Sequence, residues 1–194
     1  RALSESVESK YEDLPKRSPE ARGVGAGHHE ADDDLLGAAE WVGRALVRRA
    51  ERLTGGGLVW RYRPHVGGPA WRDHHLYDGG LGPTLFLLAL AQATGQDEWH
   101  DAGRDALASI LAHAARHPVS TMPLDEPIGG GNGLGSLVYG LTAAAALADE
   151  PECLAVAGDL AGAISARVTR DTPIVVVNGA AGAVLGLLPL YSAM

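Results

Sequence analysis

The chain has 194 residues and a formal net charge of −8, and 46% of its residues are hydrophobic although only 5% are aromatic. This length is enough for one domain with a sizeable core. The negative charge argues against nucleic acid or an anionic membrane as the main partner. The single cysteine excludes an internal disulfide and is compatible with a reducing compartment, so we expect a cytoplasmic protein.

Residues 1–34 form a charged stretch in which acidic residues outnumber basic ones and apolar residues are sparse. This composition predicts a linker that is partly disordered, with a short helix near Ser4–Leu14 and disorder through Ser18–Glu30. No signal peptide is visible, and the first residue is Arg1 rather than Met. That start suggests a processed chain or an excised piece.

The next segment predicts a helix that begins after Asp34 and runs to about Leu53, where Gly55–Gly57 stop it. A short strand-like alternation follows at Leu58–Arg63, and prolines and glycines then predict loops. The cluster Trp71, His74, His75 and Tyr77 comes next. It could line a pocket or form a packed loop anchored by Trp71, and we favour the packed loop.

Three glycine-rich segments, each followed by an apolar run, organise the rest of the chain. They are YDGGLGPTLFLLAL (Tyr77–Leu90), GNGLGSLVYGLTAAA (Gly131–Ala145) and VNGAAGAVLGLLPLY (Val177–Tyr191). Aligned on Gly82, Gly135 and Gly182, they recur about every 50 residues, which is the signature of a repeat architecture.

Amphipathic helices are predicted between these copies. Gly95 and Asp97 suit a helix end and the next helix start, and Pro151 suits a first turn. Each unit is therefore one helix that is apolar all round, and buried, followed by one that is apolar on one side. The predicted fold is all-α: an α/α toroid, or a solenoid, of helical hairpins.

Two further features have competing interpretations. His75 and Asp78 could be a pair of ligands or an acid–base pair, but Asp78 is also explained as a helix N-cap, which we favour. The apolar stretch Ile174–Met194 is long enough to span a membrane. Asn178, glycines and Pro189 interrupt it, so we predict a buried core helix, and we interpret Cys153 as an inert core thiol.

LYDGGLGPTLFLLALAQATG (Leu76–Gly95) resembles the first glycine motif of the lanthionine synthetase C-like cyclases, and GGNGLGSLVYGLTAAAALA and VVVNGAAGAVLGLLPLY resemble the second and third motifs in the right order. The resemblance covers about residues 35–194 and is closest to the cyclase domain fused to a dehydratase in class II lanthipeptide synthetases. It implies an α/α toroid with a central zinc held by two cysteines and a histidine. The zinc would activate a peptide cysteine, which adds to dehydroalanine or dehydrobutyrine to form a thioether ring.

The sequence departs from this family at its catalytic positions. Neither the Trp-Cys-x-Gly nor the Cys-His-Gly context of the zinc ligands occurs, and Val175 stands where the third motif usually carries an acidic residue. We therefore assign no metal ligand in this chain and expect it not to be catalytic alone. His75 and Asp78 remain candidate catalytic residues. Candidates for lining a substrate site are Trp71, His74, Tyr77, Asn132 and Asn178.

Residues 35–194 resemble the N-terminal half of that cyclase domain, which implies an α/α toroid with about half of a closed ring. An open half-toroid would leave the flanks of its inner helices uncovered, so we expect association with a missing C-terminal half, with a second copy, or with a precursor peptide. Two functions stay open: part of a lanthipeptide cyclase, and a non-catalytic helical-repeat module that binds a peptide or partner protein. An unrelated toroid enzyme such as a glycosidase would need two central carboxylates, and only Asp78 precedes an inner helix closely.

Overall fold

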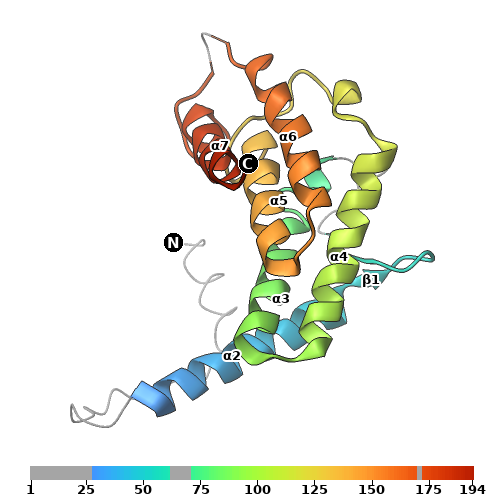
Figure 1. The fold of residues 1–194 in the computed structure, drawn as a ribbon, viewed down its shortest axis with the longest axis vertical. Coiled ribbons are helices and arrows are strands. Elements are labelled where there is room, and N and C mark those ends of the chain that lie inside the picture. Colours follow the sequence, from blue (N-terminus) through green and yellow to red (C-terminus); the bar gives the residue numbers. More distant parts are fainter. Residues whose placement is uncertain (1–27, 62–70, 170–171) are drawn as a thin grey trace, which may run out of the picture. The chain divides into compact units, whose positions relative to one another are not determined.

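The computed structural model describes residues 28–61, 71–169 and 172–194 (Figure 1). The chain divides into two compact units, Arg1–Leu35 and Leu36–Met194. The expected linker, with its short helix and disorder, lies largely outside the described residues.

The described elements are almost entirely helical, so the predicted all-α fold is confirmed. The elements are α2 (His28–Arg49), β1 (Glu51–Arg52), β2 (Leu58–Val59), η1 (Trp71–His74), α3 (Leu81–Thr94), α4 (Asp97–Arg116), η2 (Val119–Thr121), α5 (Leu134–Ala148), α6 (Glu152–Ser165) and α7 (Ala180–Ala193).

The helices follow the predicted hairpin pattern: α4 packs along α3, and α6 packs along α5. Gly95 ends α3 in the left-handed conformation (φ 68°), which glycine adopts without a steric penalty. Asp149 ends α5 in the same conformation (φ 52°). Both turns are short, so each inner helix is followed directly by the amphipathic helix that covers it.

α5 is the centre of the core, because it packs against α3, α6 and α7. Leu134, Leu137, Val138 and Leu141 are completely buried on it. Gln92 of α3 lies within hydrogen-bond distance of the Leu147 carbonyl (3.5 Å), and Leu81 meets Gly140. The two inner helices therefore run in the same direction, with their N-termini at one end.

The region before α3 differs from the predicted boundaries. α2 begins at His28 rather than after Asp34, and it ends at Arg49 rather than near Leu53. Asp32–Asp34 thus lie within the helix rather than before it. Glu51–Arg52 pair with Leu58–Val59, so the glycines between them form a hairpin turn in which Gly56 and Gly57 have positive φ.

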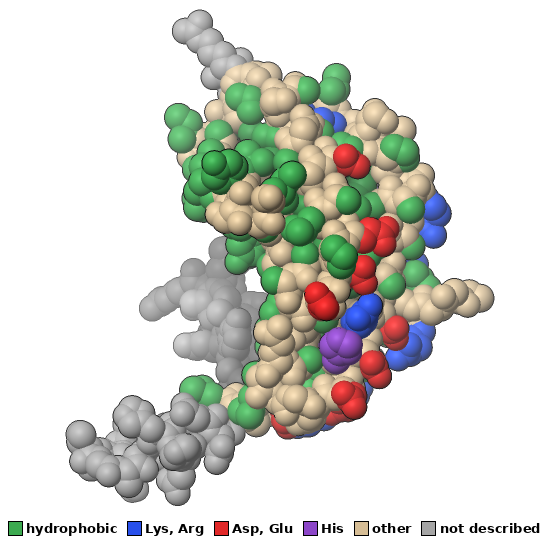
Figure 2. Space-filling model, viewed as in Figure 1, with side chains coloured by type: hydrophobic (Ala, Val, Ile, Leu, Met, Phe, Trp, Pro, Cys, Tyr) green, Lys and Arg blue, Asp and Glu red, His purple; other side chains and the backbone are tan. Residues whose placement is uncertain are grey.

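The burial of α7 differs from the sequence prediction, which expected a third buried core helix. Only Gly182, Ala183, Gly186 and Leu190 are buried on it. Val184, Leu185, Leu188 and Tyr191 are exposed on it, and Figure 2 shows hydrophobic side chains gathered over it at the upper left. The physical reason is that α3 and α5 are each covered by an amphipathic helix, whereas no described helix covers the outer side of α7.

In the described part of the chain, no helix combines the length and apolar character that crossing a membrane requires. This agrees with the interpretation of Ile174–Met194 as something other than a membrane span.

Candidate functional site

The three glycine-rich segments meet at the N-terminal end of the inner helices. The Tyr77 N–H donates to the Gly131 carbonyl (3.1 Å), and the Gly130 N–H donates to the Val176 carbonyl (2.8 Å). The N–H groups of Gly131 and Asn132 both donate to the Val177 carbonyl. We call the joined segments Tyr77–Gly80, Gly129–Gly133 and Val176–Gly179 the glycine rim.

Glycines allow these backbones to touch. Gly133 has φ 115°, which side chains with a Cβ rarely adopt, and a Cβ on Gly129 would collide with the backbone of Val177 and Asn178. The glycine-rich run before α5 therefore serves close backbone approach, as expected for a helix start. Buried Ser136 links the first two segments, since its hydroxyl accepts from the Leu76 N–H (3.4 Å) and donates to the Gly133 carbonyl (2.7 Å).

Two predicted candidates, Asp78 and Asn132, come together on this rim. With its amide oriented to satisfy its neighbours, Asn132 donates to Asp78 Oδ1 (3.1 Å) and to the Gly131 carbonyl (3.1 Å). The Asp78 side chain is 58% exposed. A carboxylate that is anchored on one side and open on the other can accept a hydrogen bond or a proton from a ligand.

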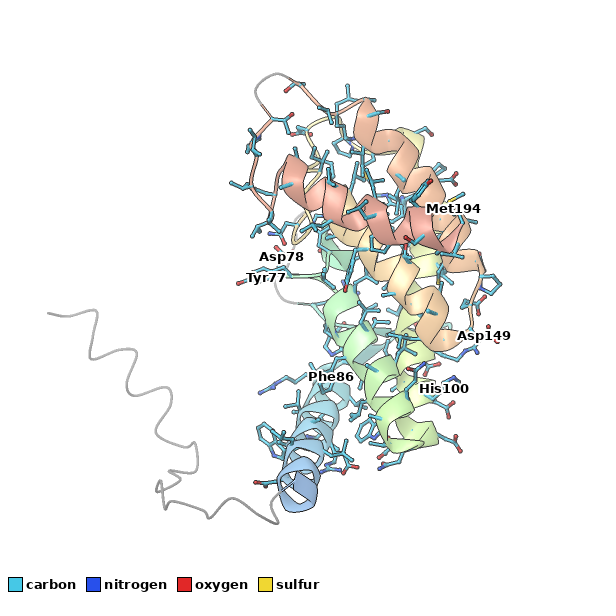
Figure 3. The ribbon with its side chains drawn as sticks, turned by 60° about the vertical axis from the view of Figure 1, so that its left-hand side comes forward. Tyr77, Asp78, Phe86, His100, Asp149 and Met194 are labelled. Atoms are coloured by element: carbon cyan, nitrogen blue, oxygen red, sulfur yellow. The ribbon has the colours of Figure 1, made fainter. Side chains whose placement is uncertain are left out.

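Asp78 is not the N-cap of α3, which corrects the interpretation that we favoured from the sequence. Gly80 occupies the cap position, and it makes no side-chain cap hydrogen bond. Figure 3 shows Tyr77 and Asp78 projecting from the chain at the start of α3, far from His100 and Asp149 at the opposite end. The Asp78 side chain is thus available for a role other than capping the helix.

His75 lies behind Asp78 and is almost completely buried. Its Nδ1 is 3.8 Å from Asp78 Oδ1, and its Nε2 is 3.0 Å from Oε1 of the buried Glu126. The Nε2 and Oε1 atoms are close but poorly aligned for a hydrogen bond, and neither has another partner among the described residues. His75 therefore sits between two carboxylates, one buried and one on the rim.

Sequence reasoning missed Glu126. It belongs to Met122–Ile128, a stretch with two prolines and two acids that gives no helix or strand pattern. The available signal was an acidic residue shortly before the second glycine-rich segment. The tight turn at Gly133 brings this residue back toward the rim.

Trp71 and His74 lie in a different cluster. Both are buried, and they pack with His113 of α4: the ring centroids are 4.9 Å apart for Trp71–His113 and 4.5 Å for His74–His113. Burial, together with the neighbouring His117 and Arg116, lowers the pKa of His74 to about 3 and that of His113 to about 4. This agrees with a packed loop that Trp71 anchors.

The remaining candidates on the rim are open to solvent. Tyr77 is 80% exposed, and Asn178 is also exposed. A groove of about 680 Å³ borders the rim, and uncharged residues line it: Leu76, Gly130, Tyr139, Val176, Gly182, Leu185, Gly186, Leu188, Pro189 and Ser192. The site thus combines an anchored carboxylate, exposed polar side chains and an apolar groove.

Within the described ranges, no group of three His, Cys, Asp or Glu side chains is placed to hold a metal ion. Cys153 is completely buried on α6, and burial raises the pKa of its thiol to about 11, so the thiolate that binds metals is disfavoured. The residues described therefore do not fit the zinc that the resemblance implies.

Residues 70–194 match the model of a family described as lanthionine synthetase C-like protein. No curated protein matches the chain. The matched range contains all three glycine-rich segments, the rim and the groove.

Proposed function

Because the chain belongs to the lanthionine synthetase C-like family, we propose that it is part of a lanthionine cyclase and that its glycine rim holds the precursor peptide. The observation that carries this proposal is the Asp78–Asn132 pair on a rim tied together by backbone hydrogen bonds. The α/α-toroid architecture of the family fits the inner and outer helices of this chain. We assign it to the class II synthetases, in which the cyclase is fused to a dehydratase, on the likeness of its three motifs.

The reaction joins Sγ of a peptide cysteine to Cβ of dehydroalanine or dehydrobutyrine. The thiol loses its proton, the double-bond electrons move to Cα, and Cα gains a proton. Asp78 is exposed and anchored, so it is the rim carboxylate that would exchange a proton with the peptide, with His75 behind it as the candidate orienting group. Tyr77, Asn132 and Asn178 supply hydrogen-bonding groups for the peptide around it.

The groove beside the rim would take the apolar side chains of the peptide. No charged residue lines it, and its wall between Gly130 and Gly182 is backbone rather than side chain. An apolar groove next to a few convergent polar groups is the usual composition of a ligand site.

The zinc chemistry of the family is not assigned to this chain. Its described residues do not supply a ligand set, so we propose that the metal centre is contributed by another part of the cyclase. A purely peptide-binding module of the same fold is the second candidate function. The Asp78–Asn132 pair on the hydrogen-bonded rim favours it as well.

Fluorescence anisotropy with a labelled synthetic peptide that carries one dehydroalanine and one cysteine tests peptide binding. Tyr77→Ala and Asn132→Ala should each weaken binding about three- to ten-fold, since each removes a contact of the rim. Tyr191→Ala is the matched control, because Tyr191 is equally exposed (85%) but lies on α7 away from the rim.

Equal affinities of the wild type and the two rim variants would contradict the proposed site. A second peptide, with alanine in place of dehydroalanine, separates the two functions. Equal binding of both peptides favours the binding module, and preference for the dehydroalanine peptide favours the cyclase.

A further inference from the structure

A buried carboxylate lies behind the glycine rim, on the other side of His75 from Asp78. The side chains of His75 and Glu126 are 3% and 8% exposed, whereas that of Asp78 is 58% exposed. Glu126 Oε1 lies 3.0 Å from His75 Nε2, and Asp78 Oδ1 lies 3.8 Å from His75 Nδ1. Each nitrogen of the imidazole ring therefore faces a carboxylate, and only the outer carboxylate is open to a ligand.

The backbone holds both buried partners in place. Gly79 packs directly on the backbone of His75, where an added Cβ would collide with it. On the opposite side, the Glu126 N–H closes a turn by donating to the Pro123 carbonyl (3.2 Å). The two side chains are therefore presented to each other by fixed backbone, which is the arrangement that a functional group needs for its orientation.

The position of the His75 ring proton follows from these distances. At 3.0 Å, Nε2 and Oε1 must share a proton, because two lone pairs would otherwise face each other, and neither atom has another partner among the described residues. A carboxyl group is ordinarily a stronger acid than an imidazolium, so this proton resides on the nitrogen. Their alignment is poor, as is common for such contacts before a ligand binds.

The other ring nitrogen has no comparable contact. Nδ1 and Asp78 Oδ1 are about 1 Å farther apart than a hydrogen bond requires, and Asn132 already donates to this oxygen. Neutral His75 therefore carries its proton on Nε2 and has a lone pair on Nδ1 that faces the rim. Rotation of the exposed Asp78 side chain can close the remaining distance.

We propose that Glu126 is a positioning residue that keeps the His75 proton on Nε2, so that Nδ1 can accept the proton that Asp78 takes from the peptide. This inference rests on the proposed function, and it extends the role of His75 from orienting Asp78 to holding its proton. A buried carboxylate that fixes a histidine tautomer in this way is a general device of proton-transfer sites.

The protons and electrons of the step balance. The peptide thiol loses its proton to an Asp78 oxygen while sulfur bonds to Cβ of dehydroalanine and the double-bond electrons move to Cα. The proton passes from Asp78 to His75 Nδ1, because imidazole is ordinarily a stronger base than a carboxylate. The resulting imidazolium lies between two carboxylates, which stabilise it. The proton returns by the same route to Cα, and both side chains regain their starting protonation.

Nitrogen NMR of the full chain, isotope-labelled on histidine, reads the protonation of both ring nitrogens, and the signal that His75→Phe removes identifies His75. At about pH 8, the wild type should hold the proton on Nε2 about ten-fold more often than on Nδ1. Glu126→Gln should reverse this preference, because the amide can donate to Nε2 while Asp78 still faces Nδ1. Asp125→Asn is the matched control: this neighbouring acid is exposed, so the proton should stay on Nε2.

The wild-type spectrum alone can overturn the proposal, whether or not the variants fold. A proton on Nδ1, or protons on both nitrogens, would leave no atom to accept the proton from Asp78. An unchanged tautomer in Glu126→Gln would also overturn it, as would a shift to Nδ1 in Asp78→Asn, because Glu126 would then not set the tautomer. The spectra need no peptide, so failure of the proposed function is recognised separately, by the absence of peptide binding in anisotropy.

Discussion

His74 and His113 are buried as neutral side chains, and this makes the fold sensitive to acid. Their pKa values, about 3 and about 4, are lowered mainly by burial. Arg116 and His117 oppose protonation of both, His75 opposes that of His74, and Asp73 alone favours that of His113. In the unfolded chain both side chains bind protons near their ordinary value of 6.5, so the unfolded state gains protons first as the pH falls.

We therefore predict that the free energy of unfolding is constant above about pH 7 and falls as the pH is lowered toward 4. The loss at pH 5 should be about 2 kcal/mol for each histidine. Urea unfolding at pH 7 and pH 5 measures this difference. His113→Phe should remove part of it, whereas His100→Phe, on the outer surface of α4, should retain all of it. Equal free energies of unfolding at the two pH values would contradict the burial of these histidines in their neutral form.

Glu126 and His75 form the second residue-scale test. Glu126→Ala should lower the free energy of unfolding by about 2 kcal/mol, because the buried His75 loses the acceptor next to Nε2. Asp125→Ala, one residue away but exposed, should change it by less than about 0.5 kcal/mol. Similar effects of the two substitutions in urea unfolding would show that the buried pair contributes nothing.

The residues of the site were only partly predictable from the sequence. Asp78 and Asn132 were both candidates, because each stands in a glycine-rich segment before an inner helix. Their contact could not be predicted, since it depends on backbone hydrogen bonds between segments about 50 residues apart, which no local pattern encodes. Glu126 and His113 were missed for the same reason: each meets its partner only through the packing of α3, α4 and α5.

At the scale of the helix, glycine decides how closely α5 and α7 approach. A Cβ on Gly135 would lie 2.8 Å from Ala183 Cα, and one on Gly186 would collide with the Gly135 carbonyl oxygen. These contacts are to backbone, which cannot move aside as a flexible side chain can. The crossing of α5 and α7 is therefore fixed by glycine on both helices.

Gly186→Ala should consequently destabilise the protein by about 2–3 kcal/mol, because the helices must separate to admit the methyl group. Gly162→Ala on α6 is the matched control: a Cβ there meets nothing within 4 Å, so alanine should stabilise the helix by about 0.5–1 kcal/mol. Thermal unfolding of the two variants measures the contrast. If both alanine substitutions stabilised the protein, α5 and α7 would not be in close contact.

The helices themselves were predictable, because long apolar runs after glycine segments and striped helices after short turns have strong periodic patterns. Two element boundaries were not. α2 extends over Asp32–Asp34, which read as a linker. The strand-like alternation from Leu58 indicated the strand Leu58–Val59. Its partner Glu51–Arg52 is too short to give a strand pattern and was predicted as the end of the preceding helix. The exposure of α7 could not be read from its composition, since buried and uncovered apolar helices have the same sequence character.

At the scale of the molecule, two inner–outer hairpins and a third inner helix place three glycine-rich segments on one rim. We interpret this arrangement as the peptide-holding part of a lanthionine cyclase. Its outer surface carries the helices α4 and α6, each packed along its inner helix. In this interpretation, the peptide rim and the zinc centre of the cyclase belong to different parts of the protein.

The most direct test of this separation is the zinc content of purified, chelator-washed protein, measured by elemental analysis. We predict less than about one zinc per ten chains, because a structural or catalytic zinc site needs at least three protein ligands that the described residues do not bring together. Near-stoichiometric zinc would contradict it. That result would place a metal centre in this chain and make catalysis by the chain alone the better account.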